Sequence, residues 1–402
     1  MNKPVESNAL AAARAHFPAL ERWTYMDISG RSVLSHEVRA ALDAHLDERQ
    51  FDGATDKARF FTLVESARGR FAQIVGCDAD EVAYTKNISD GLNMIATAMH
   101  WHDGDNVVLC PDLEHPNNVY PWLNLQRYGV EVRMVPPRDG HIPVDALIER
   151  MDARTRVATV STTTFAPGFR TDVNTLGRAC RDRDVLLLVD GAQSVGIVHT
   201  DVRASNIDAL SVSTQKGLLS LYGMGYLYVR REWAERLHPA YLARFGVDLG
   251  EAHEASLGDH AFKFAAGARR FDLGNYNFLA TAGVDASMKQ LLEWDTREIE
   301  RHVLGLSHAL ARGFLDLGLK VAGGEPGPHL ANIVTVGNMS DDQYGAGDDQ
   351  YNRLYQHLID NRVKLSIRRG MLRFSLHVYN NMDDVQRVLQ LTRDCLAASR
   401  KA

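Results

Sequence analysis

Cysteine is scarce in this chain, and the few cysteines lie far apart. The 402 residues include four of them, Cys77, Cys110, Cys180 and Cys395. They form no CxxC pair and no Cys/His cluster with the spacing of metal ligands, which excludes a disulfide-built miniature and predicts no metal site. We therefore expect reduced, mostly buried thiols.

Long apolar runs and an excess of positive charge are also missing. No stretch approaches the ~18 apolar residues of a membrane span, and the first residues have no apolar segment of the signal-peptide type. The 45 basic side chains are outnumbered by 51 acidic ones, for a net charge of −6, whereas a nucleic-acid partner usually requires a basic face. The sequence thus predicts a cytoplasmic protein that binds neither membrane nor nucleic acid.

Two common nucleotide-binding motifs are absent as well. No GxGxxG follows the first predicted strand, and no P-loop GxxxxGK[ST] is present. With 45% hydrophobic and 24% charged residues, the composition is that of an ordinary globular protein. The length is enough for about two to three domains with substantial cores.

Short apolar, β-branched segments recur through the first two thirds of the chain. We predict buried strands at 106–110, 130–135, 157–161, 185–189, 209–213 and 225–229. Helical spacing of apolar residues predicts intervening helices at 89–99, 117–127, 143–151 and 173–184. Alternating strands and helices require crossover connections, so we expect an α/β fold with a largely parallel sheet covered by helices on both faces.

The pattern changes near residue 279. Long amphipathic helices are predicted at 282–294 and 296–317, followed by sparser strand candidates at 331–336 and 372–376. The acidic, glycine-containing segment 340–349 is predicted to be a loop. This part of the chain therefore indicates a second, smaller α+β domain.

Two strand-like segments end in side chains of opposite charge. The run Val185–Val189 ends in Asp190, and Lys216 follows the run Ala209–Ser213. In an open α/β sheet, ligands bind just beyond the carboxyl ends of the strands, where both residues are expected. An aspartate there can equally cap a helix, and a single lysine is usually a solvated charge. Together they suit one chemistry, a lysine that forms an imine and an acid that protonates a pyridine nitrogen.

Two further segments are compatible with a phosphate and an aromatic ligand. Ser89 stands at the predicted start of a helix, where free backbone N–H groups and the helix dipole favour a phosphate. His115 precedes a proline at the head of another predicted helix, and its ring could stack on a flat cofactor. Taken singly, both residues would be ordinary helix-capping groups.

The order of these motifs resembles the class V aminotransferase superfamily, the cysteine desulfurase-like branch of the fold-type-I pyridoxal-phosphate enzymes. The likeness runs from YMDISG at residues 25–30 to LRFSLHVYN at 372–380. It implies an N-terminal arm (1–24) packed with the small domain, a large cofactor domain (25–278) with a mostly parallel seven-stranded sheet, and a small α+β domain (279–402). It also implies a homodimer with shared active sites, pyridoxal 5′-phosphate as cofactor and a small amino acid as substrate.

The resemblance assigns a role to each candidate site residue. The catalytic residues are Lys216, which forms the internal aldimine, Asp190, which salt-bridges the pyridinium nitrogen, and His115, which stacks over the ring. Further cofactor contacts are Gln193 near the phenolic oxygen, Gln215 before the lysine, and the phosphate-binding residues Ile88, Ser89, Ser213 and, from the neighbouring subunit, Asn275. The substrate α-carboxylate is gripped by Arg373, with Ser29 as a second substrate contact.

Departures from the family pattern concern the reaction. The segment 364–373 has no cysteine, although cysteine desulfurases carry their nucleophile shortly before the arginine. Gln215 replaces the usual histidine, as in the small alanine-glyoxylate and serine-pyruvate aminotransferases, and Phe165 stands where an asparagine is common. We therefore favour an aminotransferase acting at Cα. A β-eliminating lyase, an amino-acid epimerase and, more remotely, a non-catalytic scaffold of the same fold are the alternatives.

Two pairs of adjacent arginines have no role in this scheme. Arg368 and Arg369 precede Arg373, and Arg269 and Arg270 precede the segment that carries Asn275. Either pair is a candidate for binding a second acidic group on the substrate. Adjacent arginines are also common as surface charges or ion-pair partners, which is the simpler interpretation.

Overall fold

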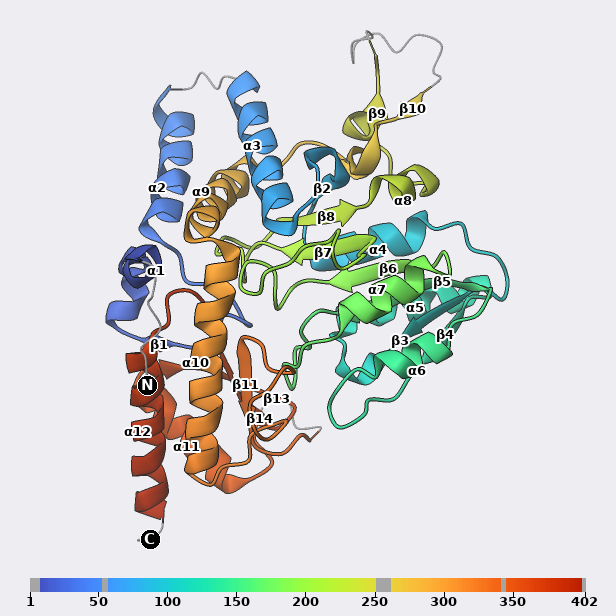
Figure 1. Ribbon diagram of the computed structural model, residues 1–402. Helices are drawn as coiled ribbons and strands as arrows, with labels where there is room; N and C mark the ends of the chain where they lie inside the picture. The colour runs from blue at the N-terminus through green and yellow to red at the C-terminus, as the bar shows by residue number, and fades with distance from the viewer. Residues whose placement is uncertain (1–7, 53–56, 251–261, 341–344, 400–402) are drawn as a thin grey trace.

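One large sheet organises the fold. The computed structural model describes residues 8–52, 57–250, 262–340 and 345–399, and seven of its strands form a sheet in the order β2-β8-β7-β6-β5-β3-β4 (Figure 1). They are β2 (Val82–Thr85), β3 (Asn106–Leu109), β4 (Glu131–Met134), β5 (Thr155–Ser161), β6 (Leu186–Asp190), β7 (Ala209–Ser213) and β8 (Gly225–Val229). Of the seven, β8 alone runs antiparallel to the other six. The predicted mostly parallel, seven-stranded α/β fold is therefore confirmed.

Helices cover both faces of this sheet. In β6, Leu186 and Leu188 join one buried cluster, whereas Leu187 and Val189 join another, as the two-residue period of a strand requires. The first cluster includes α4 (Ile88–Ala98), α5 (Tyr120–Asn124) and α8 (Arg231–Arg236). The second includes α3 (Lys57–Val75), α6 (Val144–Glu149), α7 (Val173–Arg181) and α9 (Phe278–Trp294). Burial on both sides explains why these strands read as continuous apolar runs.

The C-terminal part of the chain forms a smaller α+β unit. It contains α10 (Thr296–Asp316), α11 (Asp349–Asp360), α12 (Met382–Ser399) and a three-stranded antiparallel sheet of β11 (Ile333–Val336), β14 (Met371–Ser375) and β13 (Ser366–Arg368). Asp295, with φ of 60°, separates α9 from α10. A short hairpin of β9 (Val247–Asp248) and β10 (Lys263–Phe264) extends from the opposite side of the molecule (Figure 1).

The N-terminal segment contacts the C-terminal unit. After α1 (Asn8–Ala13), β1 (Thr24–Tyr25) pairs in parallel with β12 (Val363–Lys364). Arg14 Nη1 lies 2.7 Å from Asp384 Oδ2, and the rings of Phe17 and Tyr379 are 5.0 Å apart. The helix α2 (His36–Asp47) follows and packs against α9. The domain boundaries proposed from the sequence remain a prediction.

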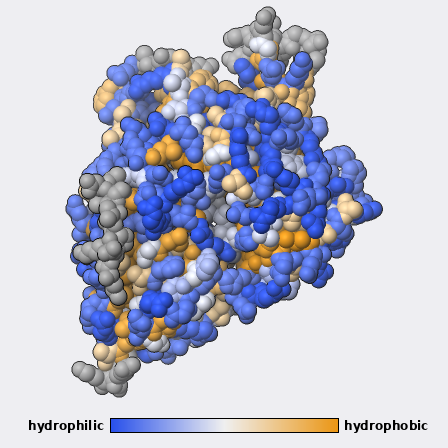
Figure 2. All heavy atoms as spheres, in the orientation of Figure 1, coloured by the Kyte–Doolittle hydropathy of each residue, from blue (hydrophilic) through white to orange (hydrophobic). Residues whose placement is uncertain are grey.

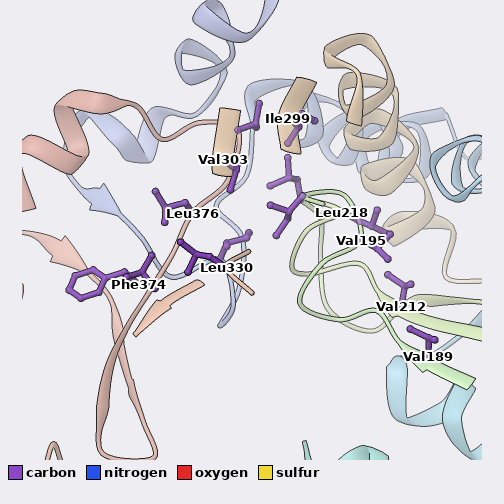
Figure 3. Packing of buried hydrophobic residues seen from close by; sticks show 14 of the residues in the cluster. Val189, Val195, Val212, Leu218, Ile299, Val303, Leu330, Phe374 and Leu376 are labelled. Carbon is purple, nitrogen blue, oxygen red and sulfur yellow. The ribbon is translucent and has the colours of Figure 1, made fainter. Parts of the chain in front are cut away.

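A single apolar core joins the large sheet to the small unit. Figure 3 shows Val189 and Val212, from β6 and β7, in the same cluster as Val303 of α10 and Phe374 of β14. Close packing of this kind resists relative movement of the packed elements. The strand that carries Arg373 is therefore held at a fixed distance from the carboxyl edge of the large sheet.

The predicted elements agree with the structure where the apolar pattern is strongest. The strands predicted at 209–213 and 225–229 are β7 and β8. The helix predicted at 117–127 is instead divided into 3-10 turns at 116–118 and 125–128 around α5, because Pro116 and Pro121 have no backbone N–H to donate. Of the predicted loop 340–349, residues 341–344 lie outside the described residues, and α11 begins at its last residue.

The surface drawn in Figure 2 is mostly hydrophilic, with apolar side chains in small separate groups. None of the helices that the structure describes combines the length and hydrophobicity needed to span a lipid bilayer. Within the same residues, no group of three or more His, Cys, Asp or Glu side chains is arranged to hold a metal ion.

Truncating Phe374 to alanine is expected to destabilise the protein by about 3–5 kcal/mol. Phe374 is fully buried, and its ring lies 5.0 Å from that of Phe314 in α10, so the variant leaves a cavity in the core that joins the two units. Urea denaturation followed by circular dichroism measures the loss. The control, Tyr128→Ala, removes a ring that is 58% exposed and should change stability by roughly 0.5 kcal/mol or less. Equal midpoints for the two variants would contradict the described core.

Candidate active site

A cavity of ≈ 200 Å³ lies at the carboxyl edge of the large sheet. The last residues of three neighbouring strands, Ser161 of β5, Asp190 of β6 and Ser213 of β7, all line it. Parallel strands bring their carboxyl ends to the same edge, which is where open α/β sheets bind ligands. Seven of the residues predicted from the sequence line this cavity: Ile88, His115, Asp190, Gln193, Ser213, Gln215 and Lys216.

Asp190 is the buried acid of this cavity. Its side chain is almost inaccessible to solvent, and Oδ1 accepts a 2.9 Å hydrogen bond from the backbone N–H of Ala192. Asp190 is thus a turn-capping residue as well as a cavity residue, so the two interpretations of the sequence are compatible. Burial raises the pKa of Asp190, and the nearby charge of Lys216 opposes that rise.

Lys216 lies on the loop that follows β7, and close backbone packing holds this loop in place. A Cβ on Gly217 would lie 2.1 Å from the carbonyl oxygen of Val195, so only glycine fits there. The carbonyl of Lys216 accepts a 2.8 Å hydrogen bond from the N–H of Leu219. Burial lowers the pKa of the Lys216 amine to about 8, against the opposing effect of Asp190. The amine is therefore far more easily deprotonated than that of an ordinary lysine.

His115 stands at the mouth of the cavity. Its Nδ1 accepts a 3.2 Å hydrogen bond from the N–H of Asn117, which places the ring proton on Nε2. Partial burial and the charge of Lys216 lower the pKa of His115, which favours the neutral form of the ring. The ring of Phe165 lies 5.6 Å away and nearly perpendicular, and the two rings contribute an aromatic wall.

The helix α4 points its N-terminus toward this region. It begins one residue earlier than predicted, because Asn87 is the N-cap and its side chain accepts a 3.0 Å bond from the N–H of Asp90. Ile88 lines the cavity, and Ser89 lies in the first turn outside the lining. A Cβ on Gly91 would lie 2.3 Å from Ser211 Oγ, so this glycine lets α4 approach β7 closely.

Three buried polar atoms of the cavity lining lack partners among the described residues. They are Ser213 Oγ, Thr163 Oγ1 and Gln193 Oε1, and unsatisfied buried groups of this kind are rare unless a ligand is to complete them. A neutralisable amine, a buried acid, an aromatic wall and a helix N-terminus accompany them. The amine, the acid, the aromatic wall and the helix N-terminus fit the aldehyde, ring nitrogen, ring face and phosphate of pyridoxal phosphate, respectively.

Arg373 approaches the same cavity from β14. Its guanidinium is fully buried and donates bonds of 3.1 Å to Ser366 Oγ and to the carbonyl of Phe165, a cavity residue. Asp27 Oδ1 lies 3.6 Å from Nη2, which has no hydrogen-bond partner in the described part of the chain. Burial lowers the pKa of Arg373 to about 10. An accessible anion would satisfy the free N–H groups of this side chain.

Ser29 lies beside the strand of Arg373. Its N–H donates a 2.9 Å bond to Ser375 Oγ, and its own Oγ is buried without a partner in the described residues. Ser29 and Arg373 are therefore adjacent, unsatisfied donors, although neither lines the ≈ 200 Å³ cavity itself.

Asn275, also predicted as a site residue, does not line the cavity that contains Asp190 and Lys216. It lines a different cavity, of ≈ 230 Å³, together with Lys86 and Asp90. Its φ of 47° places it in the left-handed region, which asparagine tolerates better than most residues. Its role across a subunit interface remains a prediction.

The sequence interpretation missed a buried hydrogen-bond network behind the cavity. Glu114 Oε1 accepts bonds of 2.7 and 3.0 Å from the N–H and Oγ of Ser161, and Oε2 accepts a 2.9 Å bond from Asn118. Burial and the charge of Asp190 raise the pKa of Glu114 to about 7. In the sequence, only its position beside His115 distinguishes Glu114. An acid before a histidine usually indicates a surface turn, so this position did not predict a buried residue.

Comparisons with known proteins identify the family of the chain. The chain matches the model of the family "Aminotransferase class-V" over residues 24–348. It is 26% identical over 388 residues to a probable cysteine desulfurase of Methanothermobacter thermautotrophicus, covering 93% of this chain and 94% of that protein. It is also 26% identical over 376 residues to an uncharacterized aminotransferase of Bacillus subtilis, covering 94% and 95%.

The solved structures show the same fold. The apo structure of a cysteine desulfurase from Thermococcus onnurineus superposes with a TM-score of 0.82 at 21% identity, covering 99% of both chains. The chain therefore belongs to the class-V aminotransferases, the pyridoxal-phosphate-dependent enzymes whose motifs its sequence carries.

Proposed function

We propose that this enzyme is an aminotransferase that acts at Cα of a small amino acid. The observation that carries the proposal is the pair formed by Asp190 and Lys216, two buried and opposite charges that line one cavity at the ends of neighbouring strands. Pyridoxal phosphate, when bound there, supplies a ring that withdraws electrons from Cα.

The side chains divide the remaining work. Lys216 holds the cofactor through its amine and afterwards moves the proton at Cα, for which its lowered pKa is suited. Asp190 keeps a proton on the ring nitrogen, while His115 covers the ring. Ser213 Oγ and the backbone near Ile88 bind phosphate, and Gln193 donates to the phenolic oxygen. Arg373 and Ser29 orient the substrate carboxylate.

The state of the cysteines favours an aminotransferase over a desulfurase. The segment before Arg373 has no cysteine, and Cys110, the one nearest to His115 in sequence, is fully buried with its pKa raised to about 12 by burial. A thiol of this kind is a poor nucleophile. Burial also raises the pKa of Cys77, Cys180 and Cys395.

A β-eliminating lyase is the second candidate, with an epimerase behind it. Both reactions begin with the same proton transfer from Cα to Lys216, so the same residues serve them. The names of the relatives include both an aminotransferase and a probable cysteine desulfurase. We also propose a cytoplasmic homodimer in which Asn275 reaches the neighbouring subunit's site.

Capture of pyridoxal phosphate by the apo-protein should accelerate as the pH rises through about 8. Imine formation needs the neutral amine of Lys216, whose pKa is lowered to about 8, so the protonated amine below that pH is unreactive. Stopped-flow absorbance of the bound cofactor between pH 6 and 10 measures the rate. Borohydride reduction and peptide mapping should then locate the cofactor on Lys216.

Two variants complete this experiment, one that should shift the pH dependence and one that serves as the control. Asp190→Asn removes the charge that raises the pKa of Lys216, so the midpoint should move to lower pH. Lys289→Ala removes a lysine whose side chain is 60% exposed and should leave the rate unchanged. A label on another lysine, or no chromophore at all, would remove the central claim.

Replacing Arg373 by glutamine should raise the Michaelis constant for the best amino-acid substrate by about 10- to 100-fold. A charge-assisted hydrogen bond contributes roughly 1.5–3 kcal/mol, and glutamine cannot supply the positive charge. Steady-state kinetics of the holoenzyme measure the change, and a cofactor titration should show unaltered affinity for pyridoxal phosphate. An unchanged Michaelis constant would contradict the proposed binding of the substrate carboxylate by Arg373.

The reaction type is tested by incubating the holoenzyme with an amino-acid panel, with and without pyruvate or glyoxylate. We expect a new amino acid only when the keto acid is present. Chromatography and an ammonia assay follow the products. Ammonia, sulfide or sulfite formed without the keto acid would instead identify a lyase, and loss of optical activity alone an epimerase.

A further inference from the structure

The four arginines left without a role by the sequence differ sharply in their surroundings. Arg269 donates a 3.0 Å bond to Glu65 Oε1. Arg270 is buried, donates to the carbonyl of Gly267 at 3.1 Å and lies over the ring of Phe264. These two side chains have structural partners and no access to the cavity lining, so the pair Arg269–Arg270 is not a substrate-binding group.

The other pair occupies the hairpin of β13 and β14. Arg369, with φ of 50°, donates a hydrogen bond to the carbonyl of Asp112, three residues before His115. This bond fastens the hairpin turn to the loop that carries His115. Arg368, in contrast, donates a 2.7 Å hydrogen bond to the carbonyl of Ile367, and it has no ion pair with any described residue.

Strand geometry places Arg368 on the side of the hairpin that faces the site. Alternate residues of a strand share a face, so Arg368 shares one with Ser366. Ser366 is the register partner of Arg373 and accepts its Nε hydrogen bond at 3.1 Å. Since Arg373 reaches the carbonyl of Phe165, a cavity residue, from this same face, the side chain of Arg368 leaves the hairpin on the side toward the cavity.

The electrostatic environment agrees with this placement. Burial lowers the pKa of His115, of Lys216 and of Arg373, and the positive charge of Arg368 lowers each of them further. The described acids around Arg373 and the cavity already have partners. Asp190 faces Lys216, Asp27 lies 3.6 Å from Arg373 and accepts from Ser366, and Glu114 accepts three hydrogen bonds. Arg368 is left as an unneutralised cation.

We propose that Arg368 binds a second anionic group of the substrate, and that the preferred substrate is an amino acid whose side chain ends in a carboxylate or similar oxyanion. The inference rests on the proposed function, in which Arg373 takes the α-carboxylate. A guanidinium with free N–H groups on the side of the hairpin toward the cavity recognises such a group strongly, and gains little from a neutral side chain.

The test compares the binding of succinate and of butyrate, which have the same carbon number but two carboxylates and one. Titration of the coloured holoenzyme measures each dissociation constant without turnover. Succinate should bind at least about 10-fold more tightly to the wild type. Arg368→Gln should abolish this preference, and Arg368→Lys should retain part of it because the charge remains.

Turnover provides the second readout. The ratio of kcat/KM for L-aspartate and L-glutamate to that for L-alanine should fall about 10- to 100-fold in Arg368→Gln. Arg387→Gln, which removes an exposed charge on α12, is the matched control and should leave the ratio unchanged.

The outcomes separate the two proposals. A wild-type holoenzyme that transaminates alanine but binds succinate and butyrate equally overturns the inference and leaves the proposed function intact. Equal losses for acidic and neutral substrates in Arg368→Gln overturn it as well. A strong, Arg368-dependent preference for succinate without any keto-acid-dependent reaction supports the inference and overturns the aminotransferase.

Discussion

The burial of two opposite charges at one edge of a sheet is the constraint on which the site depends. Moving either charge out of water costs several kcal/mol, and each charge reduces the cost of the other. Asp190 opposes the fall in the pKa of Lys216, and Lys216 opposes the rise in that of Asp190. Neither group gains full compensation within the chain, a property expected of residues retained to bind a ligand rather than to stabilise the fold. The glycine contacts around Gly217 keep the lysine loop from relaxing away.

The second requirement is that a strand from a distant part of the sequence stays in place. Arg373 follows Phe165 by 208 positions, yet its guanidinium bonds to the Phe165 carbonyl because β14 and the ends of β6 and β7 share one apolar core. Hydrophobic packing has no direction of its own, so the hydrogen bonds of Ser366, Asp27 and Arg369 set the orientation of the hairpin. Apolar packing thus sets the distance between β14 and the large sheet, and the polar contacts set the orientation of the hairpin that carries Arg373.

Sequence reasoning succeeded for features that are local and failed for those that are not. Strands β6 and β7 are buried on both faces, so their apolar runs identify them and locate Asp190 and Lys216. The edge strand β2 (Val82–Thr85) is not among the predicted strands, because alanine, tyrosine and threonine follow its single valine in place of a β-branched apolar run. The bonds of Glu114 to Ser161 join residues 47 positions apart, and no local pattern encodes such pairings. Among the arginines, Arg269 and Arg368 look alike in sequence, and only their neighbours in space distinguish them.

The network of Glu114 gives the cavity a further property. Asp190 and Glu114 are both buried acids, and the charge of Asp190 makes ionisation of Glu114 more costly. Glu114 accepts three hydrogen bonds, whereas Asp190 accepts one, from the N–H of Ala192. Within the bare chain, the donors therefore favour the charge on Glu114. Asp190, however, lines the cavity and Glu114 does not. A cation in the cavity, such as a protonated ring nitrogen, would stabilise the charge of Asp190 directly. The ionisation of Asp190 thus depends on what occupies the site, whereas the carboxyl group of Glu114 is held by the three hydrogen bonds of the network behind the cavity.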